Sequence, residues 1–277
     1  MEKIKDAIEK AKGQQSIQLP MRHRVDSSKT FDKPVRDEEE ELASIIYNET
    51  TSLKLDPVHL ENNRIVAVNK HNPLSGVFDS LRTQVLQKME ENNWRTIAVV
   101  SPTPDSGKTV VAINLAISIS QLPQKTSMLI DFDLRKPRVA SYLGIKTKNS
   151  INELLSGNAE LPDIMVNPGI PRFTVLPTNK PEPKSSEILS SKNIERMIAE
   201  VKERYESRVV IVDLPPLLAT DDAMVLLPLV DCALLVVGNG MNTESELEEA
   251  MRLLSKTNLV GVVLNRADTE PKPYYYE

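Results

Sequence analysis

Three short motifs carry residues that could do chemistry, and the first is a candidate phosphate-binding loop. Residues 101–109 read SPTPDSGKT, and the last three letters are those with which such a loop ends. Backbone N–H groups of residues 105–109 would cradle phosphates at a helix N-terminus, and the Thr109 hydroxyl would join the shell of a Mg²⁺ ion. The Lys108 ammonium, expected to be exposed at the loop, would neutralise the phosphates. The expected nucleotide-contacting residues here are Asp105, Ser106, Gly107, Lys108, Thr109 and Val110.

The other two motifs place carboxylates directly after apolar runs. DFDLRKPR (131–138) follows SMLI, and DLPP (213–216) follows RVVIV. A carboxylate at the end of a strand can orient the shell of a hydrated metal ion, directly or through water. Asp213 is therefore a candidate Mg²⁺-shell residue, and its alternative role is that of a cap or turn residue ahead of two prolines.

The segments around these motifs predict a parallel sheet. The expected strands are 96–100, 127–131, 173–176, 208–213, 232–237 and 259–265. The expected helices are 74–89, the stretch after Gly107, 187–205 and 244–257. Continuous apolar strands separated by helices indicate a mostly parallel sheet flanked by helices, with ligands at the carboxyl ends of the strands. Because all three motifs lie at such ends, the predicted fold class is α/β, a P-loop NTPase fold.

Composition excludes several classes of function. The chain has 277 residues, a formal net charge of −5 and 4% aromatic residues, which argues against nucleic acid as a partner. A single cysteine, Cys232, cannot form an internal disulfide and suits a reducing cytoplasm. No signal-peptide pattern is visible, and no apolar run approaches the roughly 18 residues that a membrane span needs. We expect a cytoplasmic protein that reaches a membrane only through a partner.

The chain divides into three expected parts. Residues 1–52 form a partly disordered extension that begins with a short amphipathic helix, a candidate handle for the partner, and continues as a polar linker. Residues 53–265 hold the P-loop domain. Residues 266–277 contain two prolines and little apolar content, which predicts a flexible tail. This tail ends in a tyrosine cluster of Tyr274, Tyr275 and Tyr276.

Over roughly residues 74–277 the sequence resembles the bacterial tyrosine kinases of exopolysaccharide synthesis. The resemblance rests on SLRT, SGKT, LIDFDLRKP, LPTNKPEPKSSEILSS, VVIVDLPPLLATDDA and the terminal YYYE. The order and spacing are most similar to the exosortase-associated branch, whose members also carry a short N-terminal helix and a linker. LIDFDLRKP is the most specific segment, since in the family it separates tyrosine kinases from P-loop ATPases that position division sites or plasmids.

The resemblance implies a function and a role for each matching residue. The chain would be an ATP- and Mg²⁺-dependent autokinase that regulates exopolysaccharide polymerisation or export. Asp131 would help to deprotonate the attacking tyrosine, Asp133 and Asp213 would join the Mg²⁺ shell, and Asn265 would meet the adenine edge or else serve as a turn residue. The phosphoacceptors would be the tyrosine cluster. Implied partners are an inner-membrane chain-length-determinant-type polysaccharide co-polymerase, which would recruit the chain, and a cognate tyrosine phosphatase.

Two departures from the family pattern leave alternatives open. Asp105 replaces a glycine of the loop; aspartate tolerates left-handed backbone angles, but its charge would repel phosphates if it faced them. Ring-forming members carry a glutamate and two arginines where this chain has Gly76, Asp79 and Arg82, so a ring built on that contact is in doubt, while other self-association stays open. The alternatives are a P-loop ATPase switch without tyrosine transfer, and a degenerate nucleotide-binding adaptor of the membrane protein.

Overall fold

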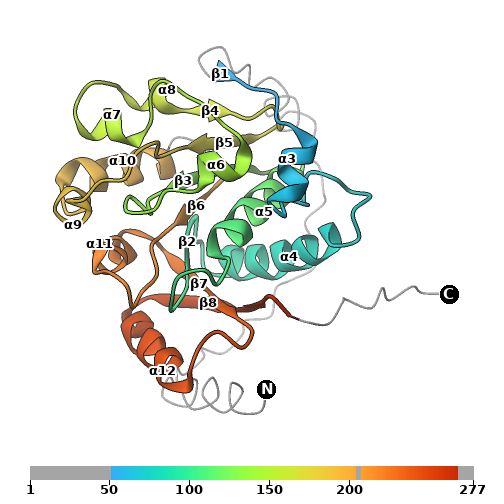
Figure 1. The fold of residues 1–277 in the computed structure, drawn as a ribbon, viewed down its shortest axis with the longest axis vertical. Coiled ribbons are helices and arrows are strands. Elements are labelled where there is room, and N and C mark those ends of the chain that lie inside the picture. The colour runs from blue at the N-terminus through green and yellow to red at the C-terminus, as the bar shows by residue number, and fades with distance from the viewer. Residues whose placement is uncertain (1–50, 204–206, 268–277) are drawn as a thin grey trace, which may run out of the picture. The chain divides into compact units, whose positions relative to one another are not determined.

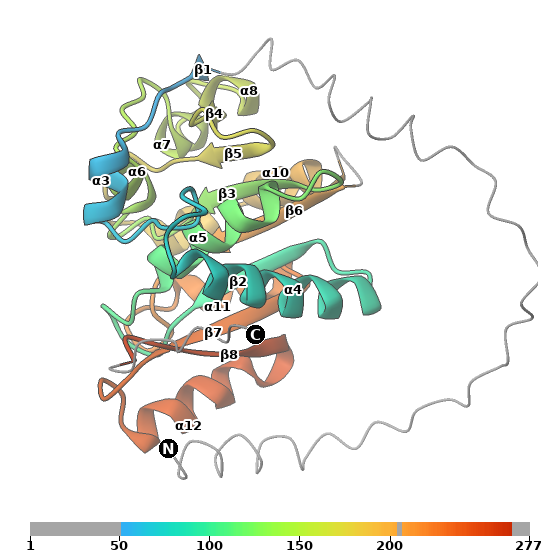
Figure 2. The ribbon, with the colours of Figure 1, turned by 90° about the vertical axis from the view of Figure 1, so that its right-hand side faces the viewer.

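A computed structural model describes residues 51–203 and 207–267. Its centre is an eight-stranded sheet in the order β1-β4-β5-β3-β6-β2-β7-β8, visible from top to bottom in Figure 2. Neighbouring strands run parallel, with the exception of the antiparallel pair β4 and β5. The strands are β1 (Thr51–Ser52), β2 (Thr96–Val100), β3 (Thr126–Asp131), β4 (Val166–Asn167), β5 (Phe173–Leu176), β6 (Arg208–Asp213), β7 (Cys232–Gly238) and β8 (Asn258–Asn265).

Helices cover both faces of this sheet. The α-helices are α3 (Pro57–Asn62), α4 (Ser75–Glu91), α5 (Lys108–Ser120), α6 (Val139–Leu143), α7 (Ile151–Leu155), α8 (Leu161–Ile164), α9 (Ser185–Leu189), α10 (Lys192–Glu203), α11 (Asp222–Leu226) and α12 (Glu244–Leu253). Two 3₁₀ turns, η1 (Leu227–Leu229) and η2 (Leu254–Lys256), follow α11 and α12. Figures 1 and 2 show α4 and α5 over one face and α10 over the other.

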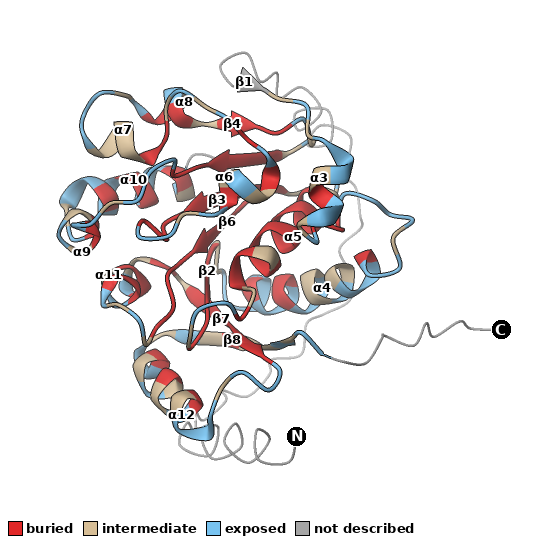
Figure 3. Ribbon diagram, in the orientation of Figure 1, coloured by how far each residue is buried: buried red, intermediate tan, exposed pale blue. Residues whose placement is uncertain are grey.

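The central strands are buried along their whole length, as Figure 3 shows. Every residue of β2, β3, β5, β6 and β7 is buried, whereas β8 at the sheet edge is largely half-exposed. Such strands read as continuous apolar runs because both faces of a parallel sheet are covered. The predicted fold class, a mostly parallel sheet flanked by helices, is confirmed.

The expected elements agree closely with the structure at the strands and less closely at the helices. All six expected strands are present, each within one residue of its predicted bounds. The helix expected over 187–205 is two helices, α9 and α10, separated at Ser190 and Ser191. The first turn of α4 is less buried than its pattern predicts, since Val77 is exposed while Val85 and Met89 are buried. The helix over 1–12 and the tail over 268–277 lie outside the described residues.

One buried polar side chain fixes the helix that follows the candidate phosphate loop. Asn114 lies in α5 and is fully buried. Its Oδ1 accepts from the backbone N–H groups of Val66 and Ala67 at 2.8 and 2.9 Å, and its Nδ2 donates to the carbonyls of Arg64 and Val110 at 3.0 and 2.8 Å. A buried amide that is satisfied in this way specifies one packing arrangement. The segment before α4 is thereby fixed to the helix whose N-terminus would meet phosphates.

Candidate functional site

The loop between β2 and α5 has the backbone conformation that a phosphate cradle needs. Asp105 has φ of 63° and Gly107 has φ of 86°, both in the left-handed region. The expectation that aspartate can take the place of glycine here is therefore confirmed for the backbone. The Asp105 side chain is exposed at the rim of the loop. At Gly107 a Cβ atom would lie 2.1 Å from Nδ2 of Asn265, so a larger residue would displace the Asn265 side chain and would also be strained by the left-handed backbone.

Hydroxyl and amide groups hold the first half of the loop. The carbonyl oxygen of Thr103 accepts from the hydroxyls of Ser101 and Ser106 at 2.8 and 3.1 Å. Asn242, in the connection between β7 and α12, donates from Nδ2 to the Thr103 hydroxyl at 2.7 Å. Sequence reasoning missed Thr103 and Asn242, because no periodic or motif signal links two residues that meet only through the strand order.

Lys108 is buried between two carboxylates. Its Nζ lies 2.9 Å from Oδ2 of Asp133 and 3.4 Å from Oδ1 of Asp213, and the residue is 8% exposed. The expectation that Lys108 is exposed at the loop is wrong, because the ends of β3 and β6 close over it. Burial alone would lower the pKa of Lys108, but the charges of Asp213 and Asp133 outweigh burial and raise that pKa. The ammonium is thus firmly protonated.

Asp213 ends β6 and connects the lysine to the first turn of α5. Its Oδ2 accepts from the Thr109 hydroxyl at 2.6 Å. Burial raises the pKa of Asp213, and the Lys108 charge and the Thr109 hydroxyl only partly offset that effect. The alternative of a plain turn or cap residue does not account for the contacts of this side chain with Lys108 and Thr109, and the role of Asp213 in a Mg²⁺ shell stays a prediction.

Asp131 ends β3, opposite Asp213 in the register of β3 and β6. Its Oδ2 accepts from the backbone N–H groups of Arg138 and Val139 at 3.1 and 2.9 Å. Its Oδ1 is buried and meets no hydrogen-bond donor among the described residues. Burial, followed by the charge of Asp213, raises the pKa of Asp131 well above its usual range. A buried carboxylate oxygen without a donor marks a place where a proton or a ligand would be bound.

The oxygen atoms gathered here suit a magnesium ion. Asp133 accepts from Lys108 and, through Oδ1, from the backbone N–H of Lys136 at 3.1 Å. Among the described residues no group of three or more acidic, histidine or cysteine side chains is placed to hold a metal ion by itself. Mg²⁺ is usually bound by one or two carboxylates together with waters and phosphates, so an open set of Asp133, Asp213 and Thr109 fits that ion.

Asn265 lies at the end of β8 and contacts the phosphate loop itself. Its Nδ2 donates to the carbonyl of Ser106 at 2.9 Å, and its backbone carbonyl accepts from Asn239 at 2.9 Å. The structure therefore brings Asn265 next to the residues of the loop motif. The contact with an adenine edge stays a prediction.

The basic residues of the second motif divide into two kinds. Arg135 pairs with the buried carboxylate of Asp222, with Nε 3.0 Å from Oδ2. Lys136 and Arg138 are exposed. Arg135 is exposed but engaged with Asp222, so Lys136 and Arg138 are the cations of this motif that could more readily add phosphate attraction.

Arg82, which lies at one of the positions that resemble the ring motif, makes its contacts within its own chain. Its Nη1 donates to Asp79 at 3.0 Å and to the carbonyl of Ser118 at 3.1 Å. Asp79 also pairs with Lys70 at 2.8 Å. These contacts account for the partly buried guanidinium, so the doubt about a ring built on this arginine stands.

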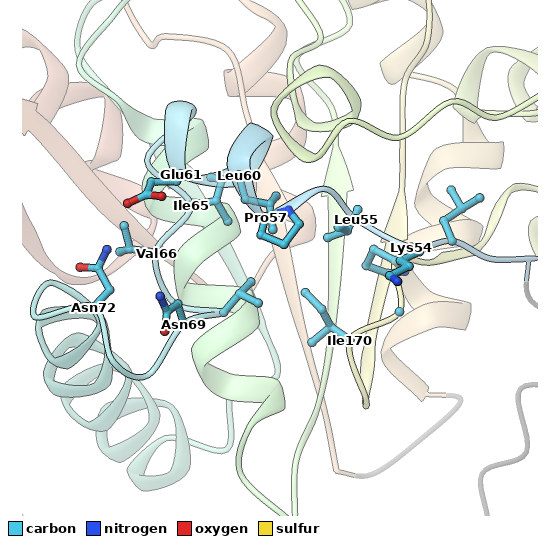
Figure 4. Close-up of a pocket in the computed structure, with 14 residues that line it drawn as sticks. Lys54, Leu55, Pro57, Leu60, Glu61, Ile65, Val66, Asn69, Asn72 and Ile170 are labelled. Atoms are coloured by element: carbon cyan, nitrogen blue, oxygen red, sulfur yellow. The ribbon is translucent and has the colours of Figure 1, made fainter.

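A separate cavity of about 510 Å³ lies away from these motifs. It is lined mainly by apolar residues of the segment 53–68 and of the loop 168–170, including Leu55, Leu60 and Ile170 (Figure 4). The loop 168–170 precedes β5 and so belongs to the amino ends of the strands. None of the predicted site residues lines this cavity, and the candidate site is the cluster at the carboxyl ends of β2, β3 and β6.

Comparison with known families places this cluster in context. Residues 97–274 match the model of the CobQ/CobB/MinD/ParA nucleotide binding domain. The chain belongs to this family. The matched range contains all three motifs and the residues that meet at Lys108, so the geometry and the family agree on a nucleotide-binding domain.

Relatives within this nucleotide-binding family are tyrosine kinases. Tyrosine-protein kinase etk of Escherichia coli K12 is 33% identical over 188 residues, which are 67% of this chain and 26% of that protein. Tyrosine-protein kinase CpsD of Streptococcus agalactiae is 28% identical over 200 residues, which are 71% of this chain and 85% of that protein. The resemblance to the bacterial tyrosine kinases is thus confirmed. The exosortase-associated branch is not confirmed and stays a prediction.

Solved structures support the same placement. The kinase domain of Escherichia coli tyrosine kinase ETK has a TM-score of 0.67 and 27% identity, over 88% of this chain and 100% of that chain. MinD of Pyrococcus horikoshii, complexed with Mg-ADP, has a TM-score of 0.53 and 20% identity over 65% of this chain and 74% of that chain, a likeness in fold alone. The chain spans about a quarter of the length of the etk and wzc relatives. Among the described residues, no helix is both long and apolar enough to cross a lipid bilayer.

Proposed function

We propose that this chain is an ATP-dependent protein-tyrosine autokinase. The observation that carries the proposal is the cluster in which buried Lys108 pairs with Asp133 and Asp213 beside the free oxygen of Asp131. A carboxylate at the strand end without a donor on Oδ1 can accept the proton of an attacking nucleophile, which is water in an ATPase and a hydroxyl in a kinase. The tyrosine-kinase relatives favour the hydroxyl of tyrosine as that nucleophile.

Each residue of the cluster has a part in this reaction. The N–H groups of residues 105–109 and Val110 would bind the phosphates of ATP, and Lys108 would exchange its carboxylate partners for the β- and γ-phosphates. Asp133, Asp213 and Thr109 would hold Mg²⁺, which when bound neutralises charge on the phosphates. Asn265 would hold the loop on one side and meet the adenine on the other.

Asp131 would act as the base. Free tyrosine has a pKa near 10, so its phenol needs a base nearby at the moment of attack. The phenolic oxygen would bond to the γ-phosphorus, the bond from that phosphorus to the bridging oxygen of ADP would break, and the phenolic proton would pass to Oδ1 of Asp131. Burial raises the pKa of Asp131, which makes its carboxylate a stronger base than a solvated aspartate.

We further propose that the tyrosine cluster of the tail receives the phosphate. Tyr274 lies nine positions after Asn265, and at about 3.3–3.6 Å per residue this stretch reaches about 30 Å, enough for the site of a neighbouring copy or for the chain's own site. In this proposal the chain has three parts, an extension (1–52), the P-loop domain (53–265) and a tail (266–277). A polysaccharide co-polymerase would recruit the chain from the cytoplasm to the inner membrane, and a tyrosine phosphatase would remove the phosphate from the tail.

Intact-mass measurement tests the proposal directly. Purified chain incubated with ATP and Mg²⁺ should gain phosphate on residues 274–276, and a copy lacking 274–277 should not. Mixing Lys108→Ala full-length chains with active tail-less chains tests transfer between molecules. Nucleotide binding without any phosphotyrosine, even with a membrane co-polymerase added, would leave the ATPase switch as the function. Absence of nucleotide binding would instead leave the adaptor.

A further inference from the structure

The loop that carries Asp133 is tied to two other segments at one buried carboxylate. Asp222, the first residue of α11, has a fully buried side chain. Arg135 donates to it from Nε at 3.0 Å and from Nη2 at 3.2 Å, so the guanidinium grips both carboxylate oxygens. Ser186 of α9 donates to the same carboxylate and to Asp221. Three segments far apart in the sequence therefore meet at Asp222.

The contact has the properties of a rigid connection. A bidentate arginine–carboxylate pair fixes direction as well as distance, which a lysine cannot do. Burial alone would raise the pKa of Asp222, but the hydrogen bonds and charge of Arg135 outweigh burial and lower that pKa. The carboxylate is thus held ionised, and it has a fixed partner on the site loop.

The rest of the loop is fastened on both sides of Arg135. Leu134 is fully buried, and its carbonyl accepts from the backbone N–H of Glu182 at 2.7 Å. On the other side, the N–H of Lys136 donates to Asp133. The Arg135–Asp222 pair lies between these two contacts and adds a third one that holds the backbone near Asp133, which is two residues away and contacts Lys108.

We propose that the Arg135–Asp222 pair is a positioning pair for the metal-shell carboxylate Asp133. The inference deepens the proposed function and rests on it. The Arg135 guanidinium makes its contacts with Asp222 and Ser186, so its proposed role is to hold the loop and differs from the attraction of phosphates that its sequence neighbours suggest. Partners that orient a metal-binding group typically change metal affinity or activity by about 10- to 100-fold when they are removed.

The test uses a substitution that keeps the positive charge and removes only the two-point contact with the carboxylate. Arg135→Lys leaves a cation for Asp222 but offers a single point of contact. A matched control is Arg252→Lys, since Arg252 also grips a carboxylate with two nitrogens, at 2.7 and 2.5 Å from Glu249, on the exposed surface of α12. Asp133→Asn is the reference for loss of the metal carboxylate itself.

Calorimetric titration with ADP, with and without Mg²⁺, gives a readout that does not depend on kinase activity. The quantity compared is the ratio of the ADP affinities measured with and without Mg²⁺. We expect Arg135→Lys to lower this ratio about 10-fold or more, as Asp133→Asn should also do, while the ADP affinity without Mg²⁺ changes less than about 2-fold. Arg252→Lys should behave as the parent. Circular dichroism and thermal unfolding should show that Arg135→Lys is folded at the titration temperature.

The outcomes separate the inference from the proposed function. If Asp133→Asn lowers the effect of Mg²⁺ and Arg135→Lys does not, the positioning role is overturned while the site assignment stands. If neither variant changes it, both the metal role of Asp133 and the positioning role fall. If Arg135→Lys weakens Mg²⁺-free binding as strongly as Mg²⁺-dependent binding, the pair is structural and the inference is overturned. Should Arg135→Lys not fold, Ser186→Ala, which removes one donor to Asp222, must show the same selective loss in smaller measure.

Discussion

Replacing Lys108 by alanine should cost stability as well as nucleotide binding. The substitution removes the cation that lies 2.9 Å from Asp133 and 3.4 Å from Asp213, and both carboxylates are buried. Breaking a buried ion pair by removing one partner destabilises proteins by about 3–5 kcal/mol, because the remaining charge is left unpaired. A domain of ordinary stability, about 5–15 kcal/mol, would still fold.

The expected size of this effect is large enough to measure by thermal and urea unfolding. A loss of about 3–5 kcal/mol corresponds to a fall in Tm of about 6–20 °C for a chain of this length. The control is Lys125→Ala, since Lys125 pairs with Glu90 at 2.9 Å on the surface, where such pairs contribute about 0–1 kcal/mol. Measurements are made without nucleotide and with a metal chelator, so that only the protein's own charges are compared.

The pH dependence gives the loss an electrostatic signature. A carboxyl whose pKa is raised on folding binds more protons in the folded state, so stability falls as pH rises from the unfolded pKa through the folded pKa. The pKa of Asp213 is already raised, and losing Lys108 raises it further. The deficit of Lys108→Ala should therefore be smaller near about pH 5 than near about pH 8. A deficit below about 1 kcal/mol at both pH values would show that Lys108 is solvated and would refute the buried cluster.

Three further predictions concern single positions. Asp105→Gly should tighten ADP binding up to about fivefold at low salt, because a like charge at ~4 Å in water costs about 1 kcal/mol. This gain in affinity should fade at high salt. Equal affinities of parent and variant at low salt would show that the exposed carboxylate does not reach the phosphates. Gly107→Ala should abolish nucleotide binding in a folded protein, because its Cβ would meet Asn265 at 2.1 Å and its φ is 86°; wild-type titration curves would contradict this geometry. Burial raises the pKa of Cys232 to about 12, so thiol reagents should label it only as fast as the native protein unfolds, whereas rapid native labelling would show that β7 is accessible.

The strands could be predicted from the sequence because their burial leaves a direct mark. Strands β2, β3, β6 and β7 lie in the interior of a parallel sheet, so each reads as an unbroken apolar run. The short elements leave no such mark. Helix α8 has four residues and β4 has two, too few to show a period of either kind. Their positions follow from packing against their neighbours.

The sequence indicates which residues meet in the candidate site, but not which of them contact one another. Strand ends and motif letters located Lys108, Asp131 and Asp213, because parallel strands bring their carboxyl ends to one edge. The burial of Lys108 depends on the order β3-β6-β2, which inserts the fourth-expected strand between the first two. No property of a single strand encodes that order. The Arg135–Asp222 contact was missed for the same reason, since its two residues meet only when the sheet is assembled.

The charge balance of the cluster explains why one site can need both a lysine and a metal ion. Asp131, Asp133 and Asp213 could carry three negative charges against the single positive charge of Lys108. Burial raises the pKa values of Asp131 and Asp213, and the neighbouring carboxylate charges raise them further. A divalent cation would balance the excess negative charge and allow Lys108 to turn to the phosphates. If the phosphates bound without the cation, Lys108 would have to leave the carboxylates, which would then have no positive partner. Nucleotide and Mg²⁺ should therefore assist each other's binding, and the strength of that coupling is set inside the cluster, at a buried lysine, and not at the exposed Asp105.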